Sequence, residues 1–355
     1  DVPLEPTQAD LDRALGFVEL LLEEFPFVAD SDRRHALSMM LNPFVRAMIV
    51  GPTPMYMVEA PTRGTGKGKL AKACLLPALN EPPLVFIPTA NDEEMRKRMF
   101  AMVAGAPEAI MIDNIDDTIN SGELATMLTE PLLGDRVLGT STTQKYPIRH
   151  TWIATGNNPT MNGDIFRRTI RIRLDAGVER PEQRVFKKVI DTWVIEHRSD
   201  LIWSALTIVQ NWIAKGKPAP LANGDELGSF ESWAYVHGGI IEAAGLYGFL
   251  HDRDNLDSLS GDEQAFSAFV DSWSRRYQTN VVWATEIIEL AKTTPQFPIK
   301  GHDDSGIAKS FGRCMQKFNN RVINGYKILR QPKGEGGARW KLEPVTITPQ
   351  EPLPF

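Results

Sequence analysis

The chain has 355 residues, of which 42% are hydrophobic and 24% are charged, and its formal net charge is −6. This composition is typical of a globular protein of two or three domains, and it excludes a disordered or fibrous chain. Cys74 and Cys314 are the only cysteines and no apolar run approaches the roughly 20 residues of a membrane span, so we expect a soluble, cytoplasmic protein without disulfides, a zinc site or a membrane partner.

Two helices are predicted in residues 1–50, which we take as an N-terminal helical segment. Apolar residues recur at helical spacing in 7–25, where Thr7 is a suitable N-cap, and a second helical pattern covers 31–49.

Between residues 51 and 178, short apolar runs alternate with helical patterns. This alternation predicts an α/β domain with a largely parallel sheet that is buried between helices. The predicted strands are MYMVEAP (55–61), PLVFIP (83–88), EAIMIDNI (108–115), RHTWIATG (149–156) and TIRIRL (169–174).

A glycine-rich loop follows the first of these strands and leads into a predicted helix at 67–79. Its sequence, PTRGTGKG at 61–68, differs from the P-loop pattern only at its first and last positions, where a P-loop has Gly and Ser or Thr. Such a loop wraps a phosphate with backbone amides, and its lysine reaches the β and γ oxygens. We predict an ATP-binding loop that uses Thr62, Arg63, Gly64, Thr65, Gly66, Lys67, Gly68 and Lys69.

Two positions depart from the usual pattern of an ATPase. Gly68 lacks the hydroxyl that would bind Mg²⁺, but water can fill that position if an acidic residue holds the ion's other side. Asp113 follows four apolar residues, as a Walker B aspartate does, and is the predicted Mg²⁺ ligand. Asn114 stands where many ATPases have a glutamate base; an amide can orient water but cannot take its proton.

The general base is therefore left open, with Glu59 and Asp116 as the nearest candidate carboxylates. Asn157 or Asn158, at the end of the strand 149–156, can contact a γ-phosphate or orient the attacking water.

An arginine pair, Arg167 and Arg168, follows these motifs. The order of phosphate loop, acidic strand end, Asn strand end and arginine pair is that of a ring ATPase, in which an arginine completes a neighbour's site. Such an arginine raises the rate of nucleotide hydrolysis by a factor of roughly 10³ to 10⁵.

The stretch from about 34 to 175 resembles the AAA+ (superfamily 3-like) helicase portion of primase-helicase proteins from phages and other mobile elements, and the likeness continues through 229–250. It implies a P-loop AAA+ core, ATP-driven DNA unwinding by a ring-shaped, typically hexameric oligomer, and often an upstream primase or polymerase module. The segments that carry it are APTRGTGKGKL, IMIDNIDD, DRVLG and TWIATGNNPTMNGDIFRRTIRIRLD.

The resemblance also implies roles for single residues. Lys67 corresponds to the Walker A lysine, Asp113 to the Walker B acid, Asn157 or Asn158 to the sensor, and Arg167 or Arg168 to the arginine finger. Arg136, in DRVLG, is a weaker interfacial candidate.

Residues 179–260 read as a helical lid region. Helical apolar spacing runs from 180 to Gly216, and a polar stretch at 251–263 reads as a linker. The tryptophans expected to pack this region are Trp193, Trp203, Trp212 and Trp233.

Residues 261–345 are predicted to form three helices and a hairpin, which together describe a winged helix, followed by a tail at 346–355. Residues 301–345 hold nine basic and four acidic side chains, although the whole chain is acidic. This segregation favours phosphate contacts on DNA, with a protein-binding winged helix as the alternative. The predicted DNA contacts are Lys309, Arg313, Lys317, Arg321, Lys333 and Arg339.

The sequence thus predicts an ATP-dependent replicative DNA helicase. Two alternatives stay open: a replication initiator or helicase loader that does not unwind processively, and a catalytically weak scaffold that binds nucleotide and DNA.

Overall fold

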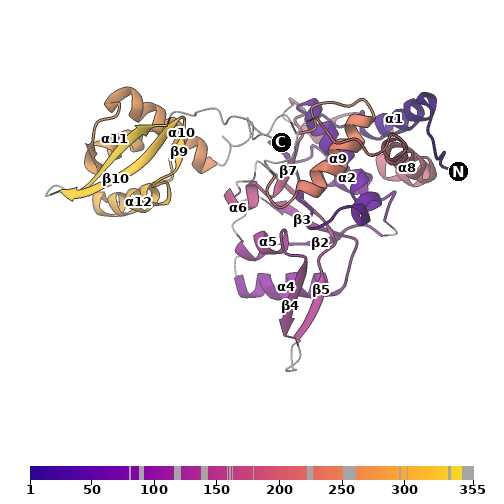
Figure 1. Cartoon of the computed structure of the whole chain (residues 1–355), viewed down its shortest axis with the longest axis horizontal. Helices are drawn as coiled ribbons and strands as arrows, with labels where there is room; N and C mark the ends of the chain where they lie inside the picture. Colours follow the sequence, from indigo (N-terminus) through magenta and orange to yellow (C-terminus); the bar gives the residue numbers. More distant parts are fainter. Residues whose placement is uncertain are drawn as a thin grey trace, which may run out of the picture. The chain divides into compact units, whose positions relative to one another are not determined.

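The chain divides into two compact units, Asp1–Arg253 and Asp254–Phe355, which are described separately (Figure 1). The computed structural model describes residues 1–79, 81–87, 92–115, 121–136, 143–157, 159, 161, 163–178, 180–221, 227–250, 261–295, 297–301, 303–334 and 337–345.

A parallel sheet organises the first unit. Within the described residues it has five strands in the order β2-β3-β6-β1-β7, and every pairing between neighbours is parallel. The predicted α/β class with a mainly parallel sheet is therefore confirmed. The strands are β1 (Met55–Ala60), β2 (Leu84–Phe86), β3 (Ala109–Ile115), β6 (Thr151–Asn157) and β7 (Thr169–Arg173).

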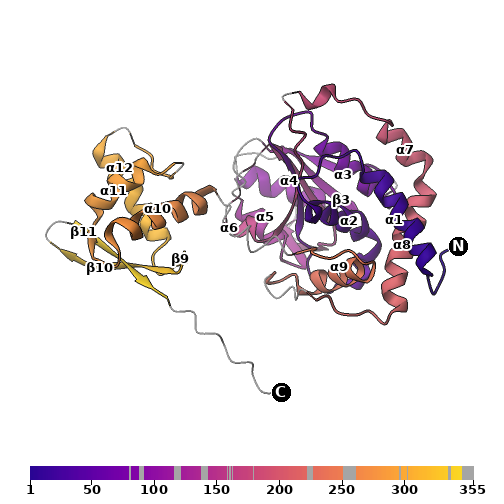
Figure 2. The ribbon, with the colours of Figure 1, turned by 90° about the horizontal axis from the view of Figure 1, so that it is seen from above.

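Helices cover both faces of this sheet (Figure 2). Alternate strand residues such as Val58, Met111 and Ile153 join one core with α1–α3 and α7–α9. On the other side lie α4, α5 and α6. The helices are α1 (Gln8–Leu22), α2 (Asp30–Val45), α3 (Lys67–Leu75), α4 (Asp92–Ala104), α5 (Gly122–Met127), α6 (Gly163–Phe166), α7 (Ile190–Glu196), α8 (Arg198–Ala214) and α9 (Glu231–Ala243), with 3₁₀ turns η1 (Arg46–Met48) and η2 (Pro181–Gln183).

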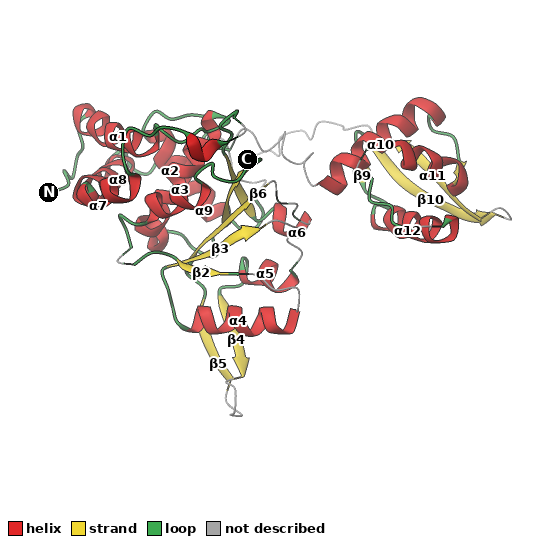
Figure 3. Cartoon of the chain, turned by 180° about the vertical axis from the view of Figure 1, so that it is seen from behind, coloured by secondary structure: helices red, strands yellow, loops and turns green. Residues whose placement is uncertain are grey.

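Two elements differ from the sequence prediction. The helical pattern predicted from residue 180 becomes helical only at Ile190, because Pro181 opens a 3₁₀ turn and Arg184 Nη2 donates 2.8 Å to the carbonyl of Glu24. An antiparallel hairpin, β4 (Leu132–Arg136) and β5 (Thr143–Pro147), was not predicted; it lies beside α4 (Figure 3).

The N-terminal helices and the tryptophans follow the prediction. The Thr7 hydroxyl accepts a 3.2 Å hydrogen bond from the amide of Asp10 and so caps α1. Trp212 and Trp233 are buried in the core of this unit. Trp193 and Trp203 are half-buried against the same core.

A buried polar network joins α2 and α9 to the sheet. Ser38 Oγ lies 2.8 Å from Tyr56 Oη and 3.0 Å from His237 Nδ1, and His237 Nε2 lies 3.2 Å from Asn42 Oδ1. Asn42 Nδ2 in turn donates 2.8 Å to Thr151 Oγ1. Burial lowers the pKa of His237 and keeps its imidazole neutral, with a single N–H. Because Nε2 faces the amide oxygen of Asn42, that N–H is on Nε2, and Nδ1 accepts from the Ser38 hydroxyl.

The second unit contains α10 (Gly261–Tyr277), α11 (Ala284–Thr293) and α12 (Asp304–Lys317). They pack on an antiparallel sheet whose strands, within the described residues, run in the order β8-β11-β10-β9. Its strands are β8 (Val282–Trp283), β9 (Val322–Ile323), β10 (Tyr326–Gly334) and β11 (Gly337–Pro344). The predicted helices and the β10–β11 hairpin are therefore present.

Aromatic side chains dominate the core of this unit. The rings of Phe266 and Phe318 stack with centroids 3.8 Å apart, and Phe269, Phe297 and Phe311 complete the cluster. No helix in the described parts of either unit is both long and apolar enough to cross a bilayer.

The buried His237 predicts a pH-dependent stability. Burial lowers its pKa to about 3, whereas an unfolded histidine has a pKa near 6.5. The unfolded state therefore binds more protons below pH 6.5, and stability falls as the pH drops from about 6.5 towards 3, by about 2 kcal/mol at pH 5. Urea unfolding at pH 7 and pH 5 measures this loss. His237→Gln should show a smaller loss than the parent, and an equal loss would contradict the assignment.

Candidate functional site

The glycine loop connects β1 to α3 in a conformation that depends on its glycines. Gly64 and Gly66 have φ angles of +78° and +102°, in the left-handed region that side chains disfavour. Thr65 Oγ1 donates 2.8 Å to the carbonyl of Thr62 and closes the loop on itself. Lys67 is the first residue of α3, so the loop ends at a helix N-terminus, where anions bind favourably.

Lys67 contacts the asparagine predicted to act with it. Its Nζ donates 2.7 Å to Asn157 Oδ1 and 3.3 Å to the carbonyl of Thr62. Asn157 ends β6, the neighbour of β1, and pairs in register with Ala60. The two side chains, 90 residues apart in sequence, thus meet at the carboxyl edge of the sheet.

Asp113 is held by a threonine of the strand between it and the loop strand. Asp113 Oδ1 accepts a 2.6 Å hydrogen bond from Thr155 Oγ1, which accepts a 3.0 Å hydrogen bond from the amide of Asn114. The β3–β6 register shifts here, and Asn114 has a φ of +56°. Thr155 therefore fixes both the carboxylate and the irregular backbone beside it. The sequence reasoning did not single out Thr155, and the signal that could have identified it is a hydroxyl side chain within an apolar strand.

The next residue, Gly156, permits the close approach of β3 and β6. A Cβ at Gly156 would lie 2.8 Å from the carbonyl oxygen of Ile115 and 2.8 Å from the Pro159 ring. The glycine is thus needed for packing at the strand end that carries Asn157.

Glu59, a candidate base, is buried inside the sheet. Both Nε and Nη2 of Arg171 donate to its Oε1, the former over 2.8 Å. Burial raises the pKa of the Glu59 carboxyl, against the lowering effect of Arg171. A second pair, Arg173 and Asp32, lies 3.1 Å apart and connects β7 to α2. These contacts favour a structural role for Glu59 over that of a general base.

The arginine pair lies at the opposite edge of the sheet from the loop of its own chain. The amide of Met55, the first residue of β1, donates 2.9 Å to the carbonyl of Arg168. Both Arg167 and Arg168 contact Asp164. The hydrogen bond from Arg167 lowers the pKa of that carboxyl, and the opposing effect of desolvation does not cancel this lowering. Neither arginine can therefore reach the glycine loop that β1 carries at its other end.

Two segments pack against the glycine loop, and the sequence did not predict either contact. Phe25, just after α1, lies 3.6 Å from the position of a Cβ on Gly66. Glu182 of η2 packs on Gly64, with its Oε2 3.0 Å from the position of a Cβ there. These contacts depend on tertiary packing and leave no local signal in the sequence.

The other predicted loop residues have plainer surroundings. Arg63 is exposed. A Cβ at Gly68 would meet no heavy atom within 4 Å, so this position has room for a side chain. Lys69 Nζ lies 3.9 Å from Asp191 of α7, on an exposed part of the helix.

Three predictions for this unit fall wholly or partly outside the described residues: Asn158, Asp116 and the side chain of Arg136. In the part of the chain that the structure describes, no group of three His, Cys, Asp or Glu side chains could hold a metal ion.

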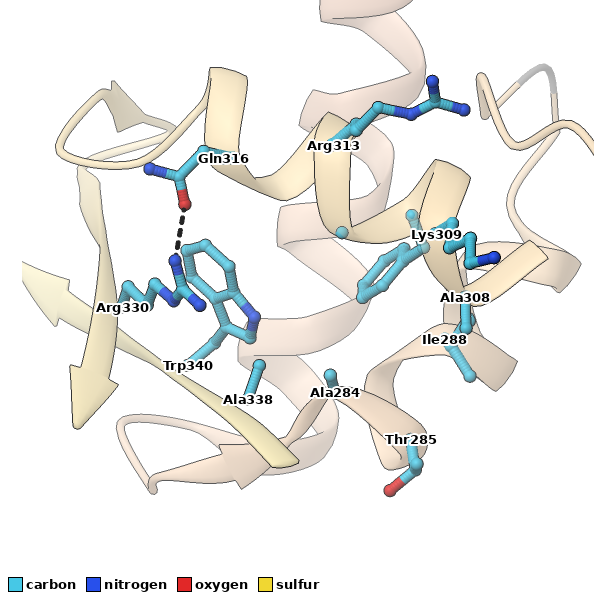
Figure 4. Close-up of a pocket in the computed structure, with 12 residues that line it drawn as sticks. Ala284, Thr285, Ile288, Ala308, Lys309, Arg313, Gln316, Arg330, Ala338 and Trp340 are labelled. Atoms are coloured by element: carbon cyan, nitrogen blue, oxygen red, sulfur yellow. Dashed lines mark hydrogen bonds between the residues drawn. The ribbon is translucent and has the colours of Figure 1, made fainter. Parts of the chain in front are cut away.

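In the second unit, predicted DNA contacts lie on α12 and around the hairpin. Lys309 and Arg313 are exposed on α12 (Figure 4). The guanidinium of Arg321 lies 5.0 Å from the ring centroid of Phe318. The guanidinium of Arg339 lies 5.4 Å from the ring centroid of Trp283. The side chains of Lys317 and Lys333 are outside the described residues.

No protein-family model matches the sequence, and a search of curated proteins gives no match. Among solved structures, the chain is similar to the A form of the apo C-terminal region of NrS-1, with 9% sequence identity over 96% of this chain and 78% of that chain, and a TM-score of 0.39. A TM-score of this size does not establish a shared fold. Function is therefore inferred from the geometry of the site itself.

Gly156→Ala should destabilise the protein by roughly 1 to 3 kcal/mol, since the added methyl group must displace backbone or the Pro159 ring. Gly122→Ala is the matched control, because a Cβ there meets no atom within 4 Å. Urea unfolding of both variants measures the effect. Equal midpoints would show that the strands do not approach as closely as described.

Proposed function

We propose that this chain is an ATP-dependent DNA helicase of a phage or mobile genetic element, built on a P-loop AAA+ core at residues 51–178. The observation that supports the proposal best is the hydrogen bond of Lys67 to Asn157. Two residues earlier on the same strand, Thr155 holds Asp113 of the neighbouring strand β3. A lysine at the start of α3, an amide at the end of β6 and a carboxylate near the end of β3 thus lie at the carboxyl ends of adjacent strands, where phosphoryl transfer uses these groups.

The residues present suit a nucleotide with Mg²⁺. The loop 62–67 would wrap the phosphates, and Lys67 would exchange its bond to Asn157 for a phosphate oxygen. Asp113 would hold Mg²⁺, which supplies neutralisation of phosphate charge, and water would replace the missing hydroxyl of Gly68. Asn157 and Asn114 can orient the attacking water, but neither can take its proton.

The position of the arginine pair agrees with a homo-oligomeric ring, which the family resemblance makes typically hexameric. Because Arg167 and Arg168 come just before β7, at the end of the sheet opposite the loop, they could complete only the site of a neighbouring copy. Asp164 would have to release the arginine that serves that site.

The second unit would bind DNA as a winged helix, with α12 and the β10–β11 hairpin presenting basic side chains to phosphates. An upstream primase or polymerase module would complete the replicative protein. A scaffold that binds nucleotide without turnover is the second candidate, and Gly68 and Asn114 are the observations that favour it.

DNA-stimulated ATP hydrolysis at low salt, with single-stranded DNA, tests the proposal. Lys67→Ala should reduce turnover at least a hundredfold, since the Lys67 ammonium lies within the loop, 3.3 Å from the carbonyl of Thr62. Lys69→Ala removes a lysine charge two residues farther along α3, where the side chain lies 3.9 Å from Asp191. This control should retain most turnover. Hydrolysis with fork unwinding supports a helicase, and hydrolysis without unwinding supports an initiator or loader. Nucleotide binding without turnover in the parent would support the scaffold.

Gly68→Ser should restore a hydroxyl ligand for Mg²⁺ in a position that has room for it. We expect the Mg²⁺ concentration for half-maximal nucleotide binding to fall, and the parallel Gly68→Ala variant to leave it unchanged. Titration of Mg²⁺ at fixed nucleotide measures both. If serine and alanine behave alike, position 68 does not face the metal.

A further inference from the structure

The first unit contains a further buried histidine, His35 of α2. Nδ1 of His35 lies 2.7 Å from the carbonyl oxygen of Arg171, and Nε2 lies 2.6 Å from the carbonyl oxygen of Phe249. A carbonyl oxygen can only accept a hydrogen bond, so each of these contacts requires an N–H on the ring. A neutral imidazole has one N–H and an imidazolium has two, so both hydrogen bonds form only when His35 is positively charged.

The contacts of His237 differ from those of His35 in their donors. The hydroxyl of Ser38 donates to Nδ1 of His237, so that ring needs only one N–H. Burial disfavours a charged ring at both positions, but at His35 two carbonyl oxygens accept from the charged form and so favour it. The partners of His237 thus suit a neutral ring, and those of His35 suit an imidazolium.

The carbonyl of Arg171 belongs to an edge strand. Within the described sheet β7 has only β1 as a neighbour, so the carbonyls on its outer side need donors from elsewhere. The amide of Val28 donates 3.1 Å to the carbonyl of Arg173, and His35 donates to Arg171, two residues earlier. His35 thus occupies a position on the sheet edge that a further strand would otherwise fill.

The carbonyl of Phe249 belongs to residues 244–250, which follow α9 without forming a helix or a strand. Among the hydrogen bonds between described residues, the one from His35 is the only one that reaches residues 247–250. The Phe249 ring also packs on Trp233, with ring centroids 5.5 Å apart. Residues 247–250 come just before the boundary between the two units, which follows Arg253. His35 thus supplies the polar part of the attachment of this segment.

The charged side chains on the elements that contact His35 are paired with opposite charges. The pairs on α2 and β7 are Arg33–Glu19, Arg34–Asp30, Arg171–Glu59 and Arg173–Asp32. Among residues 244–250 only Tyr247 is titratable, and it is exposed. None of these described groups therefore adds an uncompensated positive charge beside the ring.

We propose that His35 is an imidazolium at neutral pH and that its second proton attaches residues 247–250 to the sheet edge. When the pH rises and the ring loses one proton, one of the two carbonyl oxygens is buried without a donor, which is unfavourable. The carbonyl of Phe249 is the one that moves away, because Arg171 is fixed within a strand. The segment that leads out of the first unit is thereby held at neutral pH and loosened at alkaline pH. This inference does not depend on nucleotide or DNA binding.

NMR of the full chain with ¹⁵N-labelled histidine, of which the chain has six residues, tests the charge. At pH 7.5 an unperturbed histidine, with a pKa near 6.5, is about 90% neutral. His35 should instead show two protonated ring nitrogens at this pH, whereas His237 should show one. The His35 signal is assigned by its loss in His35→Gln or, if that variant does not fold, by elimination with variants of the other five histidines. One protonated nitrogen on His35 at pH 7.5 would overturn the proposal.

Chymotrypsin cleavage after Phe249, a buried side chain, measures the attachment of the segment. The cleavage rate is divided, at each pH, by that of a free peptide with the sequence of residues 244–253. For the parent this ratio should rise about tenfold across the pH at which NMR shows the second proton to leave, since a hydrogen bond to a charged group is lost. His237→Gln, the matched control, should retain the rise, and His35→Gln should give the higher ratio at every pH. An unchanged ratio for the parent would show that the proton of His35 does not hold the segment.

Discussion

The parallel alignment of β1, β6 and β3 is the constraint on which the candidate nucleotide site depends. The carboxyl ends of parallel strands lie at the same edge of a sheet. The loop after β1, Asn157 in β6 and Asp113 in β3 therefore lie at one edge, although they are far apart in sequence. A shift of one residue in the β1–β6 register would turn Asn157 to the other face and away from Lys67. The buried network around His237 secures this register from one face of the sheet.

Much of this arrangement could be predicted from the sequence because it has strong local signals. Buried parallel strands are continuous apolar runs, which are visible in the sequence. The predicted order of strand, glycine loop and helix is present as β1, the loop and α3. The loop glycines are a local signal because the left-handed backbone angles there favour glycine. The same holds for the helices and hairpin of the second unit, where amphipathic spacing and a glycine-rich connection are clear. The roles of Lys67, Asp113 and the arginine pair stay predictions, although their placement agrees with them.

The rest could not be predicted because it lies in tertiary contacts. The strands β4 and β5 have five residues each, and neither has the alternating or continuous apolar pattern of a buried strand. Phe25 and Glu182 reach the loop from distant segments, so their neighbourhood is set by the packing of α1 and η2. Glu59 was considered as a base because it ends the loop strand, but Arg171, more than 100 residues away, sets its surroundings.

The strand β7 runs from the arginine pair to the start of the glycine loop, and ion pairs join it to its neighbours. Arg168 stands at its start, and Arg171 and Arg173, farther along it, form ion pairs with Glu59 at the root of the loop and with Asp32 of α2. Separating a buried ion pair is costly because it leaves a charge without compensation. The strand β7 therefore cannot slide along its axis without breaking its bonds to β1 and to α2. Its five residues thus tie the start of the glycine loop to the N-terminal helices.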